Sequence, residues 1–596
     1  MKTIPERIAS IRHQMKDNEL NAYIIPSTDP HQSEYLPDHW KVREWVSGFS
    51  GSAGTLVITM DFAGLWTDSR YFIQAEQELS DSGIELVKLK VPYAPEYIEW
   101  IANTFPAESK VGCDGKIFSH ALVEKMKEVF SPKGILLNTG FDFVSSIWQD
   151  RPGLSETPVF EHEPEYAIIP RTEKLTKVRK EMSEKGIQYQ LLTSLDDIAW
   201  LFNLRGNDVE YNPVFVAYAV VSQVKSLLFV NENKVKPALK ELLEGDGITI
   251  KPYDEIDEFL GNLDLQSSIS LHAAKVSSHI FTCIPSHVKI MDQISIPARL
   301  KACKTVGEIE KIKNAMIKDG IALVKFFRWL EAGIGKEEIS ESDIGEQLTR
   351  FRSDQQGYVG NSFPTIAGFK DHGAIVHYNA KRGSDYQIDS NGMLLIDSGG
   401  QYLDGTTDIT RTIFTGEPGE EEIIDYTLVL RGLIRLSLAV FPEGTKGFHL
   451  DALARCPLWQ KRKNYGHGTG HGVGYFLNVH EGPQGISPNT AIDEPLLAGM
   501  LQSNEPGYYP EGKYGIRLEN LIVVKEDGKN NQGKFLQFET LTLFPFELEL
   551  IDTDMLSEEE MEWLNRYHNK VFENLSPHLT REENQWLLKK TRWTNR

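Results

Sequence analysis

The chain has 596 residues, 40% apolar and 25% charged, a composition typical of a globular protein that has several domains at this length. Its 85 acidic and 63 basic side chains give a formal charge of −22, which repels nucleic acid and anionic membrane surfaces. Since no dense run of Lys and Arg offsets this charge, we expect no nucleic-acid partner and no membrane partner.

Cysteine usage and hydrophobic runs indicate the cellular compartment. The four cysteines, Cys113, Cys283, Cys303 and Cys456, include no CxxC pair, which argues against a disulfide framework and against a thiolate metal site. The N-terminal stretch lacks the apolar core of a signal peptide, and the C-terminal stretch carries no hydrophobic tail. The longest apolar run, Phe215 to Val221, is far shorter than the ~20 residues that cross a bilayer. We expect a cytoplasmic protein.

An internal repeat relates residues 8–36 to residues 175–203. Each copy has apolar residues at helical spacing, a short polar break, and an apolar strand that ends in a Ser-x-Asp turn. The identical pairs are Arg12/Arg179, Met15/Met182, Ser27/Ser194 and Asp29/Asp196. Two copies this far apart imply two related α/β domains in tandem rather than a solenoid.

Composition and capping predict the domain boundaries. The Pro-containing stretch 151–170 is typical of a linker, and a second boundary is predicted near 297–305. There, Thr305 and Glu308 form a T-x-x-E capping box that begins a helix with apolar residues at helical spacing. A similar capped amphipathic helix starts at Ser557. The predicted domains are 1–155, 156–304 and 305–596, the last with a C-terminal helical extension.

Two aspartates begin the part of the third predicted domain that carries most of the suggestive polar residues. The apolar strand Met393 to Ile396 delivers Asp397 into a turn, and an unpaired carboxylate at the end of a buried strand would be costly. Asp408 opens an alternating segment in which Ile409 faces the other way. The two aspartates can therefore approach each other from neighbouring strands.

A glycine-rich segment follows and contains His467, His471 and His480. The spacing of the first two matches a zinc-binding helix, but Gly468 replaces the glutamate of that motif. Five glycines between 466 and 474 also disfavour a helix. The segment lacks the Lys-Ser/Thr pair of a phosphate-binding loop. We expect an extended segment that permits close approach of other parts of the chain.

Two glutamates complete the group of candidate ligands. Glu505 precedes a Pro-Gly turn, and Glu519 lies on an alternating strand. Four carboxylates and one imidazole form an oxygen-rich set that suits two divalent ions such as Mn²⁺, Co²⁺ or Zn²⁺, because bridging carboxylates spread the negative charge. Each residue alone is more often a turn former, a solvated side chain or a structural histidine, so their order and context carry the prediction.

The segments around these residues resemble the metal-site motifs of the pita-bread metallopeptidases: IDSGGQYLDGTTDITRT, GHGTGHGVG, VHEGP, NEPGYY and GIRLEN. Further motifs extend the resemblance to the cytosolic, three-domain aminopeptidase P family over essentially the whole chain, among them HQSEY, WTDSRYF, DIAWLFNLRG and FPTIAG. The resemblance implies an α/β (α+β) fold with two related creatinase-like N-terminal domains followed by a pita-bread catalytic domain. It also implies a homodimer formed through the third domain.

The resemblance assigns the metal ligands residue by residue. It implies that Asp397 binds one ion, that Asp408 and Glu519 bridge two ions, and that His471 and Glu505 complete the second. Two divalent ions per subunit are expected, Mn²⁺ first, with Co²⁺ and Zn²⁺ as alternatives. All five ligands are present in the sequence.

The resemblance also assigns residues to the substrate. His377, His467 and His480 match histidines around the bound peptide, to which the ligand His471 is added, and Arg70 matches a first-domain arginine implicated in peptide binding. Asn504, before the ligand glutamate, departs from the family pattern and is expected to alter the surroundings of the ligands rather than the ligands themselves.

The implied reaction releases the N-terminal residue from peptides with proline in second position, by attack of a metal-bridging hydroxide on the carbonyl before proline. The tertiary nitrogen of proline has no N–H, so general aminopeptidases fit it poorly. We predict Glu505 as the proton shuttle, His480 as a group that stabilises the oxyanion, and His377 as a substrate-binding and catalytic residue with His467 near the proline ring.

Two alternatives remain open. Prolidase performs the same chemistry on Xaa-Pro dipeptides but normally has one N-terminal domain, whereas two are inferred here. A catalytically inactive pita-bread module would serve as a binding surface, and such modules have lost ligands that this chain retains. Cleavage of Xaa-Pro dipeptides alone, without cleavage of Xaa-Pro-Xaa tripeptides, would indicate a prolidase. Protein that stays inactive and binds no metal after addition of Mn²⁺ or Co²⁺ would indicate the binding module.

Overall fold

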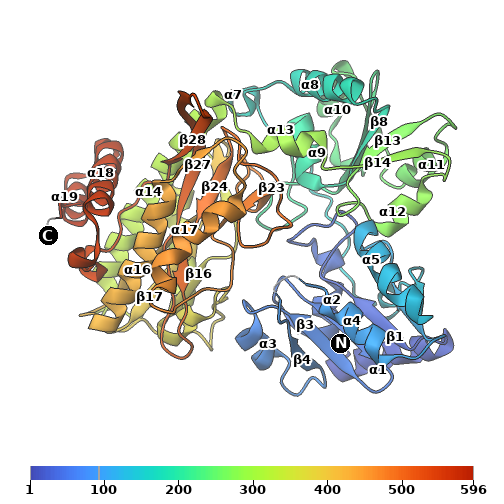
Figure 1. Ribbon diagram of the computed structural model, residues 1–596, viewed down its shortest axis with the longest axis horizontal. Helices are drawn as coiled ribbons and strands as arrows, with labels where there is room; N and C mark the ends of the chain where they lie inside the picture. Colours follow the sequence, from blue (N-terminus) through green and yellow to red (C-terminus); the bar gives the residue numbers. More distant parts are fainter. Residues whose placement is uncertain (1, 92–93, 595–596) are drawn as a thin grey trace. The chain divides into compact units, whose positions relative to one another are not determined.

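The computed structural model describes residues 2–91 and 94–594 of the chain. Its internal contacts divide it into two units, one of Met1–Pro164 with Ile169–Pro297 and the other of Glu165–Ile168 with Ala298–Arg596. Figure 1 labels the helices and strands and colours them along the sequence, from blue at the N-terminus to red at the C-terminus. Among the described residues, no helix is both long and apolar enough to cross a membrane.

Unit 1 contains two six-stranded mixed sheets with the same topology. The first has the order β4-β3-β2-β1-β5-β6, and the second has the order β12-β11-β10-β8-β13-β14. The strands of the first are β1 (Ala22–Ile25), β2 (Thr55–Thr59), β3 (Ala63–Thr67), β4 (Glu85–Lys88), β5 (Lys110–Cys113) and β6 (Leu136–Asn138). Those of the second are β8 (Tyr189–Leu192), β10 (Ala217–Ser222), β11 (Ser226–Val230), β12 (Ile248–Lys251), β13 (Ser268–Leu271) and β14 (Lys289–Asp292).

The tandem repeat predicted from the sequence is confirmed. Helix α1 (Ile4–Asp17) and helix α8 (Arg171–Glu184) both have 14 residues and begin 167 positions apart (171 − 4). Strands β1 and β8 keep the same offset (189 − 22 = 167), and each pairs with one antiparallel and one parallel neighbour. The same apolar spacing in both copies therefore builds the same helix and central strand.

The repeats are bound to each other within unit 1. The ring of His31, from the first repeat, contacts Thr193 O at 2.9 Å and the Tyr253 hydroxyl at 2.9 Å, both in the second repeat. The two repeats consequently form one unit, and the predicted boundary near residue 155 falls inside it. The division into three domains stays a prediction.

Helices cover the sheets of unit 1. They are α1, α2 (Val42–Ser47), α3 (Phe72–Glu78), α4 (Glu96–Thr104), α5 (His120–Phe130), α6 (Val144–Ile147), α8, α9 (Leu195–Phe202), α10 (Pro237–Gly245), α11 (Glu255–Gly261) and α12 (Ser278–Cys283). A short pair, β7 (Phe160–Glu161) and β9 (Leu204–Arg205), joins the linker to the second repeat. Helices α7 (Pro164–Ala167) and α13 (Ile296–Ala302) lie where the chain passes between the units.

Unit 2 surrounds its sheets with longer helices. They are α14 (Val306–Gly333), α15 (Glu341–Ser353), α16 (Glu420–Ser437), α17 (Gly447–Trp459), α18 (Glu558–Leu575) and α19 (Arg581–Lys590). The predicted capping boxes are present at Thr305 with Glu308 and at Ser557 with Glu560, so α14 and α18 begin where the sequence places them. The predicted C-terminal helix α18 and the following helix α19 pack against α14 (Figure 1).

Two sheets of unit 2 carry the candidate ligands. One has the order β16-β17-β20, from Ile366–Phe369, Met393–Ser398 and Ile409–Phe414. The other has the order β21-β28-β27-β24-β22-β23, from Val440–Pro442, Gly533–Thr540, Asn520–Asn530, Leu501–Asn504, Gly470–Gly472 and Glu481–Ile486. Short pairings add β15 (Tyr358–Asn361), β18 (Gly400–Tyr402), β19 (Gly405–Thr406), β25 (Gly507–Tyr508) and β26 (Ile516–Arg517).

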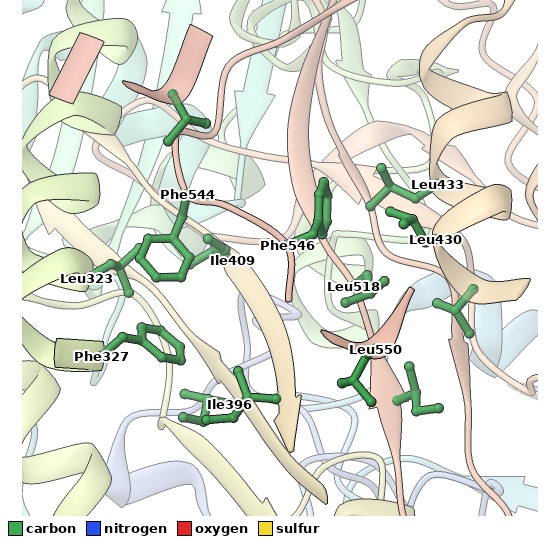
Figure 2. Close-up of a cluster of buried hydrophobic side chains, with 14 of the residues drawn as sticks. Leu323, Phe327, Ile396, Ile409, Leu430, Leu433, Leu518, Phe544, Phe546 and Leu550 are labelled. Atoms are coloured by element: carbon green, nitrogen blue, oxygen red, sulfur yellow. The ribbon is translucent and has the colours of Figure 1, made fainter. Parts of the chain in front are cut away.

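A large apolar cluster lies in unit 2 between these sheets and helices α14 and α16. Figure 2 shows part of it, with Leu323 and Phe327 from α14 facing Phe544 and the strand residue Ile396. Every residue of β17 is buried, which explains why its sequence is apolar up to Asp397 without alternation. Burial of this cluster holds the strand ends, and the ligands on them, in fixed positions.

Candidate metal centre

The two aspartates reach the site from paired strands, as predicted. Asp397 is the fifth residue of β17, and Asp408 immediately precedes β20. The antiparallel register places Ser398 opposite Ile409, so the carboxylates emerge at the same end of the pair. Both residues are buried, with 7% and 4% of their surface exposed.

The other three candidate ligands come from neighbouring strands of the larger sheet. His471 lies in β22, Glu505 directly follows β24, and Glu519 directly precedes β27. The sheets meet where the Glu519 N–H donates to Thr410 O at 3.1 Å and the Thr410 hydroxyl donates to Glu519 Oε2 at 2.8 Å. Strand ends from both sheets thus converge on one place.

The glycine-rich segment is extended, as expected. A Cβ on Gly470 would lie 2.0 Å from Ser503 O, and one on Gly472 would lie 2.2 Å from Glu481 O. Both distances are impossible for a side chain, so glycine is required for the strands beside His471 to approach. The glycines therefore serve strand packing and place the imidazole close to the carboxylates.

The ligand atoms lie within reach of common ions. Asp408, His471 and Glu519 each offer one atom within 4.8 Å of the others. His471 Nε2 lies 3.6 Å from Asp408 Oδ2 and 3.5 Å from Glu505 Oε1. Asp397 Oδ1 is buried and has no hydrogen-bond partner among the described residues. A buried carboxylate oxygen that lies next to these ligand atoms and lacks a hydrogen-bond partner is expected for a metal ligand.

The pKa shifts of the carboxylates also support a metal centre at this place. Burial, followed by repulsion from neighbouring carboxylates, raises the pKa of Asp408 and Glu505 well above the usual range. Burial and the charge of Asp397 raise the pKa of Glu519 to about 7. So many carboxylates in one buried place need positive charge to stay ionised. The donor set, which adds one imidazole, fits divalent cations.

Sequence reasoning missed Arg517, which supplies part of that positive charge. Its guanidinium donates to Asp397 Oδ2 at 2.6 Å and to the Tyr509 hydroxyl at 2.8 Å. The alternating pattern of GIRLEN indicates this residue, because residues two apart in an extended segment share a face and Arg517 lies two residues before Glu519. The motif resemblance predicts only Glu519 as a functional residue of that segment.

The predicted substrate histidines lie around the ligands. His467 Nε2 contacts the Tyr509 hydroxyl at 2.8 Å, so Tyr509 connects it to Arg517. The ring of His480 lies 4.3 Å from that of His471, centroid to centroid. The carbonyl of Val376 accepts from Arg517 at 3.3 Å, which brings the adjacent His377 to the same part of unit 2. All three are therefore near the carboxylate cluster.

Two other predicted positions have different surroundings. Arg70 belongs to unit 1, where its guanidinium pairs with Asp68 at 2.8 Å. Asn504 is buried, and its amide donates to Leu433 O at 2.9 Å and to the Ser437 hydroxyl at 3.0 Å. These two acceptors belong to α16, so Asn504 anchors β24 to a helix and does not contact the ligands through these bonds.

Family models cover nearly the whole chain. Residues 310–526 match metallopeptidase family M24, and residues 534–593 match the C-terminal region of peptidase M24. Residues 7–139 and 150–308 each match a creatinase/prolidase N-terminal domain. These matches confirm the predicted fold of two creatinase-like domains followed by a pita-bread domain.

Full-length relatives agree with the family models. The chain is 42% identical to a probable Xaa-Pro aminopeptidase P of Sordaria macrospora, over 98% of each chain. It is 41% identical to Xaa-Pro aminopeptidase 1 of Dictyostelium discoideum, over 98% of this chain and 95% of that protein. The X-prolyl aminopeptidase of Caenorhabditis elegans, described as a cytosolic enzyme with a di-nuclear active site, aligns over 100% of both chains with a TM-score of 0.95 and 32% identity. The chain therefore belongs to metallopeptidase family M24, and within it to the Xaa-Pro aminopeptidases P.

Proposed function

We propose that this chain is a metal-dependent aminopeptidase that releases the N-terminal residue from peptides with proline in second position. The observation that carries the proposal is the convergence of Asp408, His471 and Glu519 in a chain that matches Xaa-Pro aminopeptidases over its whole length. The two N-terminal repeats favour this activity over that of a prolidase, which normally has one such domain.

The proposed metal ligands are Asp397, Asp408, His471, Glu505 and Glu519, which together hold two divalent ions. Mn²⁺ is the proposed ion, with Co²⁺ and Zn²⁺ as alternatives, because the set is rich in oxygen and contains one imidazole. When bound, such a pair of ions supplies a hydroxide at neutral pH and polarises the carbonyl before proline.

The residues of the chain divide the remaining work. Glu505, half-buried and with Oε1 3.5 Å from His471 Nε2, takes the proton of the nucleophile and passes it to the departing proline nitrogen. His480, next to His471, stabilises the developing oxyanion. His377 and His467 bind the peptide near the proline ring. Arg517 orients Asp397 through its 2.6 Å contact.

Three further assignments belong to the proposal. We place the protein in the cytoplasm, with support from the cytosolic relative of known structure. The homodimer through the third domain and the binding of peptide by Arg70 rest on family resemblance. The domains 1–155, 156–304 and 305–596 are supported by the repeat and by the capping box that starts α14.

Metal analysis combined with a peptide panel tests the function. Chelator-treated protein is reloaded with Mn²⁺, Co²⁺ or Zn²⁺ and assayed on Xaa-Pro-Xaa tripeptides, Xaa-Ala-Xaa tripeptides and Xaa-Pro dipeptides. We expect two ions per chain after loading with Mn²⁺, and cleavage of the proline tripeptides only. Glu505→Gln is expected to lower kcat by roughly 10²-fold or more, and added metal is not expected to restore it. Cleavage of dipeptides alone would identify a prolidase, and absence of both metal and activity would identify a binding module.

A further inference from the structure

A second group of metal-ligating side chains converges outside the candidate metal centre, in the part of the chain that the structure describes: Asp257, His279 and Cys283. Asp257 lies on α11, whereas His279 and Cys283 lie on α12, and both helices belong to unit 1. Residues four apart on a helix share a face, so the imidazole and the thiol point the same way. Asp257 reaches this face from the neighbouring helix.

The distances are close to those of a metal shell. His279 Nε2 lies 2.8 Å from Asp257 Oδ2 and 3.9 Å from Cys283 Sγ, and the three ligand atoms are all within 4.8 Å of one another. A tetrahedral zinc ion, with bonds of about 2.0–2.3 Å, separates its ligand atoms by about 3.3–3.7 Å. Small side-chain rotations therefore bring all three ligand atoms around one ion.

The backbone under these side chains is fixed by the core. Helix α11 buries Ile256 and Leu260, and α12 buries Ile280, all in one apolar cluster. The polar side is accessible, since 36% of the His279 side chain and 46% of the Asp257 side chain are exposed. An ion can thus enter from solvent and find ligands held on two packed helices.

We propose that Asp257, His279 and Cys283 bind one borderline divalent cation, zinc in preference to manganese, at a site separate from the candidate metal centre. A thiolate and an imidazole select zinc, whereas manganese prefers oxygen ligands. Three protein ligands leave the fourth position of a tetrahedral ion to water. Glu258, in the first turn of α11, adds negative charge that attracts a cation, whereas Glu255 pairs with Lys251 at 3.0 Å.

Binding at this site releases a proton. Burial, together with the charge of Asp257 and a hydrogen bond with it, raises the pKa of Cys283 to about 11, so the thiol is protonated at neutral pH before the ion arrives. Zinc binding breaks the S–H bond, forms a zinc–thiolate bond and passes the proton to solvent. The affinity for zinc consequently rises with pH.

Cobalt spectroscopy on the full-length protein tests the site. The protein is stripped with a chelator, saturated with Mn²⁺ and titrated with Co²⁺, and the thiolate-to-cobalt charge-transfer band in the near ultraviolet is followed. This band reports only the Cys283 site, because the proposed ligands of the metal centre include no cysteine. We expect the band to reach the intensity of one thiolate-bound Co²⁺ per chain and to disappear when excess Zn²⁺ is added.

Matched variants assign the band. Cys283→Ser is expected to abolish it, whereas Cys456→Ser, which changes another half-buried helical cysteine, is expected to retain it. His279→Gln is expected to weaken Co²⁺ binding at least tenfold with the thiol present. Circular dichroism of each metal-free variant checks its fold. If the wild-type protein shows no band, or if Cys283→Ser retains it, the group is only an ion pair between Asp257 and His279.

This inference is independent of the proposed function. Cleavage of a Xaa-Pro-Xaa tripeptide by Mn²⁺-loaded Cys283→Ser is expected to equal that of the wild-type protein, because the site lies in the other unit from the candidate metal centre. Loss of the cobalt band with full peptidase activity therefore supports the site without bearing on the reaction.

Discussion

At the scale of single residues, Arg517 decides how much negative charge the candidate metal centre carries before an ion binds. It is buried and contacts both Asp397 and Tyr509, which in turn contacts His467. One guanidinium therefore connects a predicted metal ligand to a predicted substrate-binding histidine. A lysine cannot replace it, since a single ammonium lacks the planar fork of donors.

We expect Arg517→Ala to lower kcat/KM for a Xaa-Pro-Xaa tripeptide by at least roughly 10²-fold, because Asp397 loses the partner that orients it. Leaving one buried charge unpaired is also expected to lower the free energy of unfolding by about 3–5 kcal/mol. Tyr509→Phe removes only the hydroxyl and is expected to lower kcat/KM by about tenfold or less. Steady-state kinetics with metal analysis of each variant measure both effects. Activity of Arg517→Ala within about threefold of wild type would show that Asp397 does not need this partner.

His568 on α18 predicts how stability depends on pH. Its Nε2 accepts from the Phe546 N–H at 3.1 Å, and burial, followed by the charge of Arg411, lowers its pKa to about 3. An unfolded histidine has a pKa of about 6.5. Between these values the unfolded state binds a proton that the folded state does not, so the free energy of unfolding falls as the pH falls from about 6.5 towards 3.

His568→Gln removes the imidazole that takes up a proton on unfolding. The glutamine side chain still offers an oxygen that can accept the Phe546 N–H hydrogen bond. We expect the variant to be less stable than the wild type at pH 7 and the difference to shrink by up to about 1.4 kcal/mol per pH unit as the pH falls below 6.5. Denaturant midpoints at pH 7, 6 and 5 measure the difference. Parallel stability curves for the two proteins would mean that His568 is protonated in the folded state as well.

At the scale of elements, the approach of β22 to its neighbours places His471 beside the carboxylates. Gly470 and Gly468 stand two residues apart in the same segment but differ in their surroundings. A Cβ on Gly470 would lie 2.0 Å from Ser503 O, whereas the nearest atom to a Cβ on Gly468 would be 3.4 Å away. The two positions form a matched pair.

We expect Gly470→Ala to push β22 away from β24, to destabilise the protein by roughly 1–3 kcal/mol and to weaken metal binding at least tenfold. Gly468→Ala is expected to stay within about 0.5 kcal/mol of wild type, because its new methyl group meets only ordinary contacts. Metal titration and denaturant unfolding of both variants provide the comparison. Equal effects of the two substitutions would contradict the packing argument.

At the scale of the whole molecule, the two units are expected to respond differently to metal, because the proposed ligands all lie in one of them. Four of the five proposed ligands are carboxylates, and all five belong to unit 2. Ligand binding to the folded state stabilises it by about 2.7 kcal/mol when the ion is at 100 times its Kd. Unit 1 contains none of these ligands, so its stability is expected to depend on catalytic metal far less.

We expect chelator treatment to lower the thermal midpoint of unit 2 by several degrees and to leave that of unit 1 within about one degree, because only unit 2 loses a ligand. Scanning calorimetry of the Mn²⁺-loaded and chelated protein, with hydrogen exchange to assign the transitions, measures both. Manganese is the appropriate ion here, since zinc is expected to bind unit 1 as well. Equal shifts in the two units would show that they unfold as one.

The sequence alone determined the types and order of the proposed ligands. Metal ions need carboxylate oxygens or imidazole nitrogens as ligands, and the residues that supply them lie in short sequence motifs such as GHGTGHGVG and GIRLEN. It also determined the tandem repeat, because helix and strand periodicity recur at one offset and fold into the same local elements. The capping boxes of α14 and α18 were predicted for the same reason.

Only the tertiary structure decided which distant residues meet. Arg517 reaches Asp397 across 120 positions of sequence, and Asp257 reaches His279 across 22. The absence of a CxxC pair argues against a thiolate metal site, whereas the site proposed at Cys283 uses no second cysteine, because its other ligands are His279 on the same helix and Asp257 on α11. Contacts of this kind depend on how strands and helices pack, and packing is set by the whole apolar core rather than by any local pattern.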